Sequence, residues 1–213
     1  MTAIEVKNLT VSYGDYEVLK DFSLTVEVGE AVLIKGPSGC GKSTLLHAVC
    51  GLIPNVIEAD CSGEVLIFGQ SIWEKSVADR AEKLGIVFQN PETQLFCDSI
   101  EDEIAFGLEN ICLPHDEMDR RIKTVLELTG MESFRHASPK ELSGGQKQRV
   151  ILAAVIALNP QVLLLDEALS QLDGKAKLIL SEHLKQLRSE GRTMLMVDHD
   201  NDLNSIANRV VEI

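Results

Sequence analysis

Apolar residues follow two different periods along this chain, and each period indicates a different kind of element. Near the N-terminus Ile4, Val6 and Leu9 alternate with polar residues, which is typical of a half-buried strand. Strand-like segments follow at residues 18–26 and, between two glycines, at residues 63–69. We expect these segments to form a small antiparallel sheet beside a larger core.

Short apolar runs further along the chain predict strands that are buried on both faces. They occur at residues 31–35, 85–88, 162–165, 193–197 and 210–213. Helical segments lie between the later runs, at about residues 175–188 and 200–208. Because strands that alternate with helices form parallel sheets with right-handed crossovers, we predict an α/β fold with a parallel-sheet core.

The segment from residue 91 to residue 159 contains no convincing strand. Ile100, Ile104 and Leu108 mark one face of a helix, and a second helix is expected from about residue 116 to residue 129. We interpret this segment as a helical subdomain inserted into the α/β core.

These patterns together predict one domain that covers residues 1–213. Residues 1–90 and 160–213 would form the core with its antiparallel part, and residues 91–159 would form the helical subdomain. Neither an internal repeat nor a low-complexity linker divides the chain.

The residues that follow the run 31–35 fit the pattern G-x-x-x-x-G-K-[ST] of a phosphate-binding loop. Its glycines let successive N–H groups converge on one hollow, and the N-terminus of the next helix adds its positive dipole end. Lys42 would reach the β- and γ-phosphates, and the Ser43 hydroxyl would bind Mg²⁺. The nucleotide-binding residues expected from this motif are Gly36, Pro37, Ser38, Gly39, Cys40, Gly41, Lys42, Ser43 and Thr44.

A second glycine-rich stretch, residues 142–146, reads Leu-Ser-Gly-Gly-Gln and precedes an apolar segment. Ser143 can cap a helix there, and Gly144 and Gly145 leave the first N–H groups of that helix uncovered. The pattern also fits an ordinary helix start softened by glycines. An exposed helix N-terminus is nevertheless an anion site, and together with Lys42 it suggests a shared nucleotide.

Two carboxylates, Asp166 and Glu167, follow the apolar run 162–165. The carboxyl edge of a parallel sheet is where ligands bind, and adjacent strand residues point to opposite sides. We therefore expect Asp166 to join Ser43 around Mg²⁺ and Glu167 to polarise an attacking water. Gln89 ends another buried run, where its side chain could contact Mg²⁺ or that water.

Composition and charge exclude several classes of function. The net charge of −13 argues against a sequence-independent nucleic-acid surface and against direct binding to anionic lipid. The longest apolar run, residues 150–158, is too short to span a membrane, and the first residues do not form a signal segment. The five cysteines are scattered without CxxC spacing, so we expect neither zinc nor disulfides and infer a reducing cytoplasm.

Taken in their order along the chain, these motifs resemble those of the ATP-binding cassette (ABC) ATPases. The resemblance covers the whole chain and rests on residues 36–44, Gln89, 142–146, 162–167, 170–173 and His199. It implies a P-loop NTPase fold, ATP and Mg²⁺ as cofactors, and a head-to-tail dimer. In that dimer the nucleotide bound by the phosphate loop of one subunit faces the signature residues of the other, which are Ser143, Gly144, Gly145 and Gln146.

The resemblance also implies roles for single residues. Glu167 would be the general base, and His199 would contact the γ-phosphate. Asp173 would lie in the loop that joins the two sites across the dimer. Tyr13 stands where the family has an aromatic residue stacked on adenine, with Tyr16 as the alternative.

A narrower likeness lies in residues 87–96, Val-Phe-Gln-Asn-Pro-Glu-Thr-Gln-Leu-Phe. This stretch is similar to the energy-coupling factor ATPases, which power the uptake of vitamins and of nickel or cobalt ions in prokaryotes. The likeness implies an integral membrane transporter subunit contacted through the helical subdomain, and a peripheral location on the cytoplasmic face of the cell membrane. The second ATPase subunit would be an identical chain or a paralogue.

One alternative is an ABC ATPase of another type of transporter, and two further alternatives belong to other classes. ABC ATPases that serve DNA repair, chromosome structure or the ribosome usually carry coiled-coil insertions, a second cassette or basic segments, none of which occurs here. A nucleotide-binding regulatory module without turnover is disfavoured by Glu167 and His199. The chain departs from the family pattern at Ala168, where Pro is usual, at Gln171, where a small residue is common, and at Asp198, where Thr or Ser is usual.

Overall fold

The computed structural model describes residues 1–198 and 203–213. In this part of the chain the strands form two sheets, a four-stranded sheet of order β2-β1-β4-β5 and a five-stranded sheet of order β6-β7-β8-β3-β9. The first is antiparallel and the second is parallel throughout. The predicted α/β core with a small antiparallel subdomain is therefore confirmed.

The antiparallel sheet is built mainly from residues that precede the phosphate loop. Its strands are β1 (Thr2–Tyr13), β2 (Tyr16–Glu27), β4 (Asp60–Ile67) and β5 (Gln70–Ser71). The predicted alternation puts Ile4, Val6 and Leu9 of β1 in the core. These side chains share one apolar cluster with the helix that follows the phosphate loop, α1 (Lys42–Val49).

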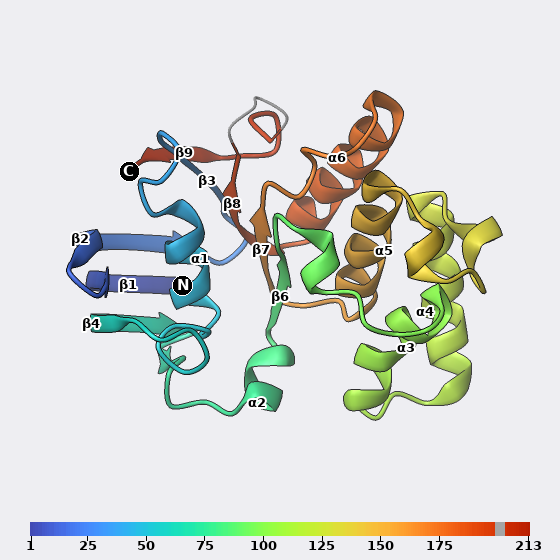
Figure 1. Ribbon diagram of the computed structural model, residues 1–213, viewed down its shortest axis with the longest axis horizontal. Helices are drawn as coiled ribbons and strands as arrows, with labels where there is room; N and C mark the ends of the chain where they lie inside the picture. Colours follow the sequence, from blue (N-terminus) through green and yellow to red (C-terminus); the bar gives the residue numbers. More distant parts are fainter. Residues whose placement is uncertain (199–202) are drawn as a thin grey trace.

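The parallel sheet is covered on both faces, which explains its continuous apolar runs. Its strands are β3 (Ala31–Lys35), β6 (Leu84–Val87), β7 (Val162–Asp166), β8 (Thr193–Val197) and β9 (Arg209–Glu212). Alternate residues of β7 and β8 belong to different clusters, so that Leu164 packs on the side of α1 and Leu165 on the other side. The second side is covered by α5 (Gly144–Ala157) and α6 (Gly174–Ser189) (Figure 1).

The helical subdomain contains α3 (Ile100–Asn110), α4 (His115–Thr129) and α5, which pack together around a third apolar cluster (Figure 1). The predicted faces are confirmed, since Ile100, Ile104 and Leu108 are buried in it. Short 3-10 helices at Pro91–Thr93, Glu132–Phe134 and Pro139–Glu141 connect these elements.

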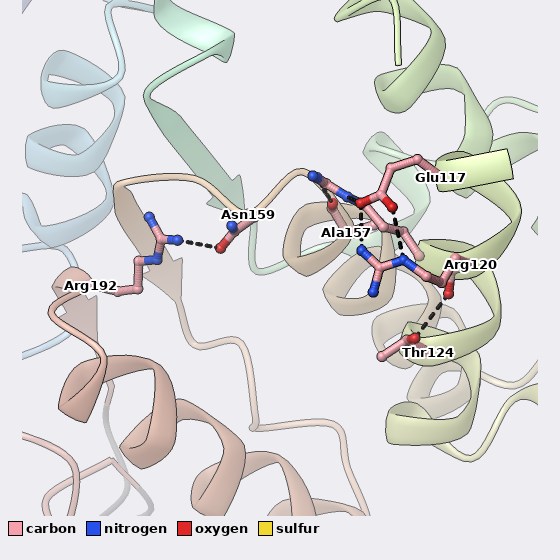
Figure 2. Close-up of polar contacts among 7 residues, drawn as sticks. Glu117, Arg120, Thr124, Ala157, Asn159 and Arg192 are labelled. Atoms are coloured by element: carbon pink, nitrogen blue, oxygen red, sulfur yellow. Dashed lines mark hydrogen bonds and ion pairs between the residues drawn. The ribbon is translucent and has the colours of Figure 1, made fainter. Parts of the chain in front are cut away.

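Arginines hold the C-terminal end of α5 from two directions, and Figure 2 shows these contacts. Glu117 on α4 accepts hydrogen bonds from Arg120 and Arg121, and Arg121 donates from Nη1 to the carbonyl of Ala157 at 3.0 Å. A cation at a helix C-terminus is electrostatically favourable. Just beyond the helix, Arg192 of the core donates to Asn159 at 2.6 Å.

The structure differs from the sequence prediction in three elements. The helix expected at residues 200–208 is a turn over 203–206, and residues 199–202 lie outside the described part of the chain. Asn208 ends this turn because its backbone and side chain both bond to Ala31 of β3. The helix α2 (Val77–Ala81) and the two-residue strand β5 were not predicted, since α2 has no buried residue that would give it an apolar period.

No helix in residues 1–198 and 203–213 combines the length and the apolar character that crossing a membrane requires.

Candidate nucleotide site

The predicted phosphate loop connects β3 to α1, as its motif requires. Gly39 and Gly41 have φ angles of 81° and 102°, which residues with a side chain rarely adopt. Gly41 is also enclosed, because a Cβ there would lie 2.7 Å from the side chain of Leu19. Glycine is therefore favoured at Gly39 by the backbone angle alone, and at Gly41 by both the backbone angle and the lack of space.

Lys42 is buried at the first position of α1. Its Nζ donates hydrogen bonds of 2.8 Å to the carbonyls of Gly36 and Pro37, and the Cys40 sulfur lies 3.7 Å from it. These contacts hold the ammonium group inside the loop, where a phosphate group would meet it.

A cavity of about 380 Å³ opens in front of the loop. It is lined by Val18, Ser38, Gly39, Gly41, Lys42, Ser43, Thr44, Gln89 and Glu167. The fold thus brings the phosphate loop together with two predicted residues from distant parts of the sequence. Its volume is within the usual range for small-molecule sites.

Gln89 and Glu167 meet at the carboxyl edge of the parallel sheet because β6 and β7 are neighbours. Gln89 Nε2 donates to Glu167 Oε2 at 2.8 Å. Glu167 has a φ angle of 49°, and its N–H donates to the carbonyl of Val197 at 2.9 Å. A left-handed backbone costs a residue with a side chain roughly 1–3 kcal/mol, and such positions cluster at functional sites.

Gln94 fixes the end of β6, and the sequence prediction assigned it no contact. Its Oε1 accepts from the N–H of Phe88 at 2.8 Å, and its Nε2 donates to the carbonyl of Ile86 at 3.1 Å. This side chain continues the hydrogen bonding of the strand beyond its last residue. Gln89, the next residue after Phe88, is thereby held at the cavity.

Asp166 and Ser43 are the two residues, besides Gln89, that we expect to bind magnesium. Ser43 lines the cavity, whereas Asp166 is buried at the last position of β7 and is not among the lining residues. Together with Gln89 they offer a hydroxyl, a carboxylate and an amide oxygen. Oxygen donors of this kind suit Mg²⁺.

Ser143 caps α5, as its sequence position predicted. Its Oγ accepts from the N–H of Gln146 at 3.3 Å, and the N–H of Ser143 donates to Gln146 Oε1 at 2.8 Å. This reciprocal pair is a capping box, for which the Ser-x-x-Gln spacing was an available signal. Gln146 therefore fixes the helix start whose first N–H groups belong to Gly144 and Gly145.

The signature residues and the phosphate loop are separate within one chain. The cavity in front of Lys42 includes no residue of the segment 143–146. The two helices that begin at these sites cover opposite faces of the parallel sheet, α1 on one side and α5 on the other.

Four further predicted residues lie outside this cavity or outside the described residues. Tyr13 and Tyr16 pair across the tip of the β1-β2 hairpin and are both exposed, so both remain candidates for contact with adenine. Asp173 caps α6 by accepting from the N–H of Ala176 at 2.9 Å, which lowers the pKa of its carboxyl. His199 lies outside the residues that the structure describes.

The chain is similar in sequence to a known protein family and to individual members of it. The profile of the ABC transporter family matches residues 19–170. Over 212 residues the chain is 42% identical to the energy-coupling factor transporter ATP-binding protein EcfA1 of Streptococcus thermophilus, covering 98% of this chain and 75% of that protein. It is 41% identical over 214 residues to an ABC transporter ATP-binding protein of Methanosarcina acetivorans, covering 99% of this chain but only 33% of that protein.

Two solved structures share the fold. One is cbiO1 from Clostridium perfringens, described as part of the ABC transporter complex cbiONQ, with 32% identity, a TM-score of 0.79 and coverage of 99% of this chain and 84% of that one. The other is the ATP-binding cassette MJ0796, a dimer in a post-hydrolysis state bound to ADP and Pi, with 29% identity, a TM-score of 0.86 and coverage of 99% and 94%.

Proposed function

Because this chain belongs to the ABC transporter family of ATPases, we propose that it hydrolyses ATP as one half of a dimer that energises a membrane importer of the energy-coupling factor type. One observation carries the proposal most directly. The phosphate loop, Gln89 and Glu167 line a single cavity, with a 2.8 Å hydrogen bond between the last two.

ATP would bind with its phosphates in the loop of residues 36–44. Lys42 Nζ now bonds to two neutral carbonyls, and phosphate oxygens are stronger acceptors for a cation because they are charged. The ammonium group is close enough to exchange partners without moving out of the loop. Binding energy would therefore come from the loop N–H groups, the α1 N-terminus and Lys42 together.

Mg²⁺ would accompany the nucleotide, and we assign it to Ser43, Gln89 and Asp166. The donor set is made of oxygen atoms, which fits this ion. When bound, Mg²⁺ neutralises charge on the β- and γ-phosphate oxygens.

Glu167 would accept the proton of the attacking water. Its carboxylate already lines the cavity and accepts a hydrogen bond from the Gln89 amide, which fixes its orientation. Proton transfer to a positioned base contributes typically 10²–10⁴-fold to a rate. We propose from the family resemblance that His199 contacts the γ-phosphate in this step.

The signature residues would act on the nucleotide of a second subunit. Ser143 and Gly144 are exposed, so the start of α5 is open to a partner. The capping box holds the helix N-terminus in one geometry, and an N-terminus of this kind attracts phosphate. The dimeric, nucleotide-bound state of the MJ0796 structure supports this arrangement, in which Asp173 would lie between the two sites.

An integral membrane subunit would contact the helical subdomain near Phe96. Phe96 is 66% exposed and Phe106 is 47% exposed. Their rings pack edge to face, with 4.8 Å between the ring centroids. Phe96 also borders a hollow of 220 Å³ that Leu95 and Cys97 help to line. Exposed aromatic residues beside a hollow are typical of protein interfaces. The chain would then lie at the cytoplasmic face of the membrane, held there by this subunit.

We propose a vitamin or a transition-metal ion as the transported solute, because residues 87–96 resemble the energy-coupling factor ATPases, which power the uptake of such solutes. The similarity to EcfA1, named for an energy-coupling factor transporter, supports this type of transporter.

Affinity purification of the chain from its own membranes tests the proposal. We expect an integral membrane protein to co-purify, and we expect the complex to hydrolyse ATP. The matched control is the Glu167→Gln variant, which should recover the same partner without turnover. Recovery of nucleic acid in place of a membrane protein would contradict the transport function.

A further inference from the structure

Gln171 lies in the loop between β7 and α6, at a position where the family commonly has a small residue. Its neighbours Leu169 and Leu172 are buried in the core, which anchors the loop backbone. Gln171 itself is exposed. Its side chain is therefore presented outward from a loop that is fixed on both sides.

The side chain of Gln171 bonds to the strand end that carries Gln89. Gln171 Nε2 donates to the carbonyl of Gln89 at 3.3 Å. Gln89 in turn donates from its own amide to Glu167 at 2.8 Å. A series of two hydrogen bonds thus runs from Gln171 through Gln89 to the proposed general base.

The other side of Gln171 touches the start of the signature helix. A Cβ on Gly144 would lie 2.8 Å from Gln171 Oε1, and a Cβ on Gly145 would lie 2.8 Å from the Gln171 carbonyl oxygen. Both distances are shorter than a real Cβ contact. The obstacle at Gly145 is backbone, so glycine is needed there, whereas a Cβ at Gly144 would push aside the end of the Gln171 side chain. Close by, Gln148 of α5 donates to the carbonyl of Ala168 at 3.1 Å, which fastens the helix to the same loop.

We propose that Gln171 is a positioning residue that holds the Gln89–Glu167 pair and the start of the signature helix in register. The inference rests on the proposed function, because the signature would contact the nucleotide of the partner subunit. A shift of α5 caused by that nucleotide would press on Gln171 and move the carbonyl of Gln89. In this way Gln171 would couple two hydrolysis sites. One is the partner subunit's site, which this chain completes with its signature residues, and the other is the site formed by this chain's own phosphate loop, Gln89 and Glu167.

The first test compares Gln171→Ala with Gln186→Ala. Gln186 is also exposed and bonds through its amide, but to Glu190 at the far end of α6. We expect Gln171→Ala to lower kcat about three- to tenfold with KM for ATP within twofold, since Gln171 does not line the cavity in front of the phosphate loop. Gln171→Glu, which keeps the length but cannot donate, should behave like Gln171→Ala. A kcat equal to that of Gln186→Ala would overturn the proposal.

A double-mutant cycle tests the contact with the helix. Gly144→Ala should displace the Gln171 amide and speed amide exchange in residues 88–96, and the same change in the Gln171→Ala background should speed this exchange little further. Fully additive effects would mean that the two positions act independently and would contradict the inference. If Gln171→Ala lowered the melting temperature but left kcat unchanged, Gln171 would have a structural role alone.

Amide hydrogen exchange separates this inference from the proposed function, because it needs no turnover. In Gln171→Ala the amides of residues 143–149 and 88–96 should exchange at least threefold faster than in Gln186→Ala. Absence of ATP hydrolysis by the native complex would refute the proposed function. Equal exchange in the two variants would refute the role of Gln171 whether or not the native complex hydrolyses ATP.

Discussion

Glu92 and Lys147 form an ion pair in which the carboxylate and the ammonium are 2.6 Å apart. Glu92 follows Gln89 in the segment that borders the proposed membrane-subunit surface, and Lys147 lies in the first turn of α5. The pair therefore joins the partner-facing segment directly to the signature helix. The hydrogen bond from Lys147 lowers the pKa of Glu92.

We predict that breaking this pair reduces the response to the membrane subunit. Lys147→Glu should lower partner-stimulated ATP hydrolysis about two- to threefold, in keeping with the modest strength of exposed ion pairs. Combining it with Glu92→Lys should restore most of the stimulation, because the pair reforms with its charges exchanged. The measurement is ATPase activity of the purified complex, and an unrestored double variant would contradict a direct role for the pair.

The two left-handed glycines of the phosphate loop should respond differently to alanine. At Gly39 a Cβ meets no atom within 4 Å, so Gly39→Ala adds only backbone strain. At Gly41 a Cβ would also collide with Leu19 at 2.7 Å. We expect Gly41→Ala to be less stable than Gly39→Ala by about 1–3 kcal/mol, and to bind ATP more weakly.

Urea unfolding and nucleotide titration of the two variants measure this difference. Equal stabilities would show that the loop relaxes away from Leu19.

The stability of the helical subdomain should depend on pH through Glu117. Its hydrogen bonds from Arg120 and Arg121 lower the pKa of Glu117 to about 2. A carboxyl whose pKa falls on folding stabilises the protein above its unfolded pKa, and this contribution is lost as the pH falls toward the folded value. We therefore expect Glu117→Gln to melt about 1–3 °C below the native chain at pH 7, and the difference to vanish between about pH 4.5 and pH 2.

Thermal melting of the native chain, Glu117→Gln and the control Glu127→Gln over this pH range checks the prediction. Glu127 lies on the same helix and controls for the replacement of a glutamate on α4. A Glu117→Gln difference that persisted at pH 2 would exclude ionisation of Glu117 as its cause.

The aromatic pair on the helical subdomain should decide recovery of the membrane subunit. We expect the Phe96→Ala, Phe106→Ala double variant to retain less than a tenth of the partner in affinity purification, because large aromatic residues dominate interface energies. Val77→Ala is the control, since Val77 is 69% exposed on α2. Equal recovery with both variants would place the contact elsewhere.

The sequence predicted those parts of the site that depend on contacts between residues close together in the chain. The loop glycines and the Ser143 cap are set by neighbouring residues, so their motifs were sufficient. The contact between Gln89 and Glu167 spans 78 positions, and it follows only from the pairing of β6 with β7. Sequence order suggested that the two residues act together, but the strand order of the sheet determines their distance.

Contacts made by long side chains could not be predicted in the same way. Gln94, Gln171 and Arg121 each bond to a backbone carbonyl, and a carbonyl has no sequence signature. Such bonds depend on where a distant chain segment passes. The short helix α2 was missed for a different reason. It has a capping box, but none of its residues is buried, so it shows no apolar period.

In the proposed mechanism a complete hydrolysis site needs two chains, with the phosphate loop of one facing the signature residues of the other. Glu167→Gln tests it most directly, because it should preserve ATP binding and block turnover. Light scattering of this variant with and without ATP should give the mass of one chain without ATP and twice that mass with ATP. A Glu167→Gln variant that stayed monomeric at saturating ATP, or that hydrolysed ATP at the native rate, would contradict the account.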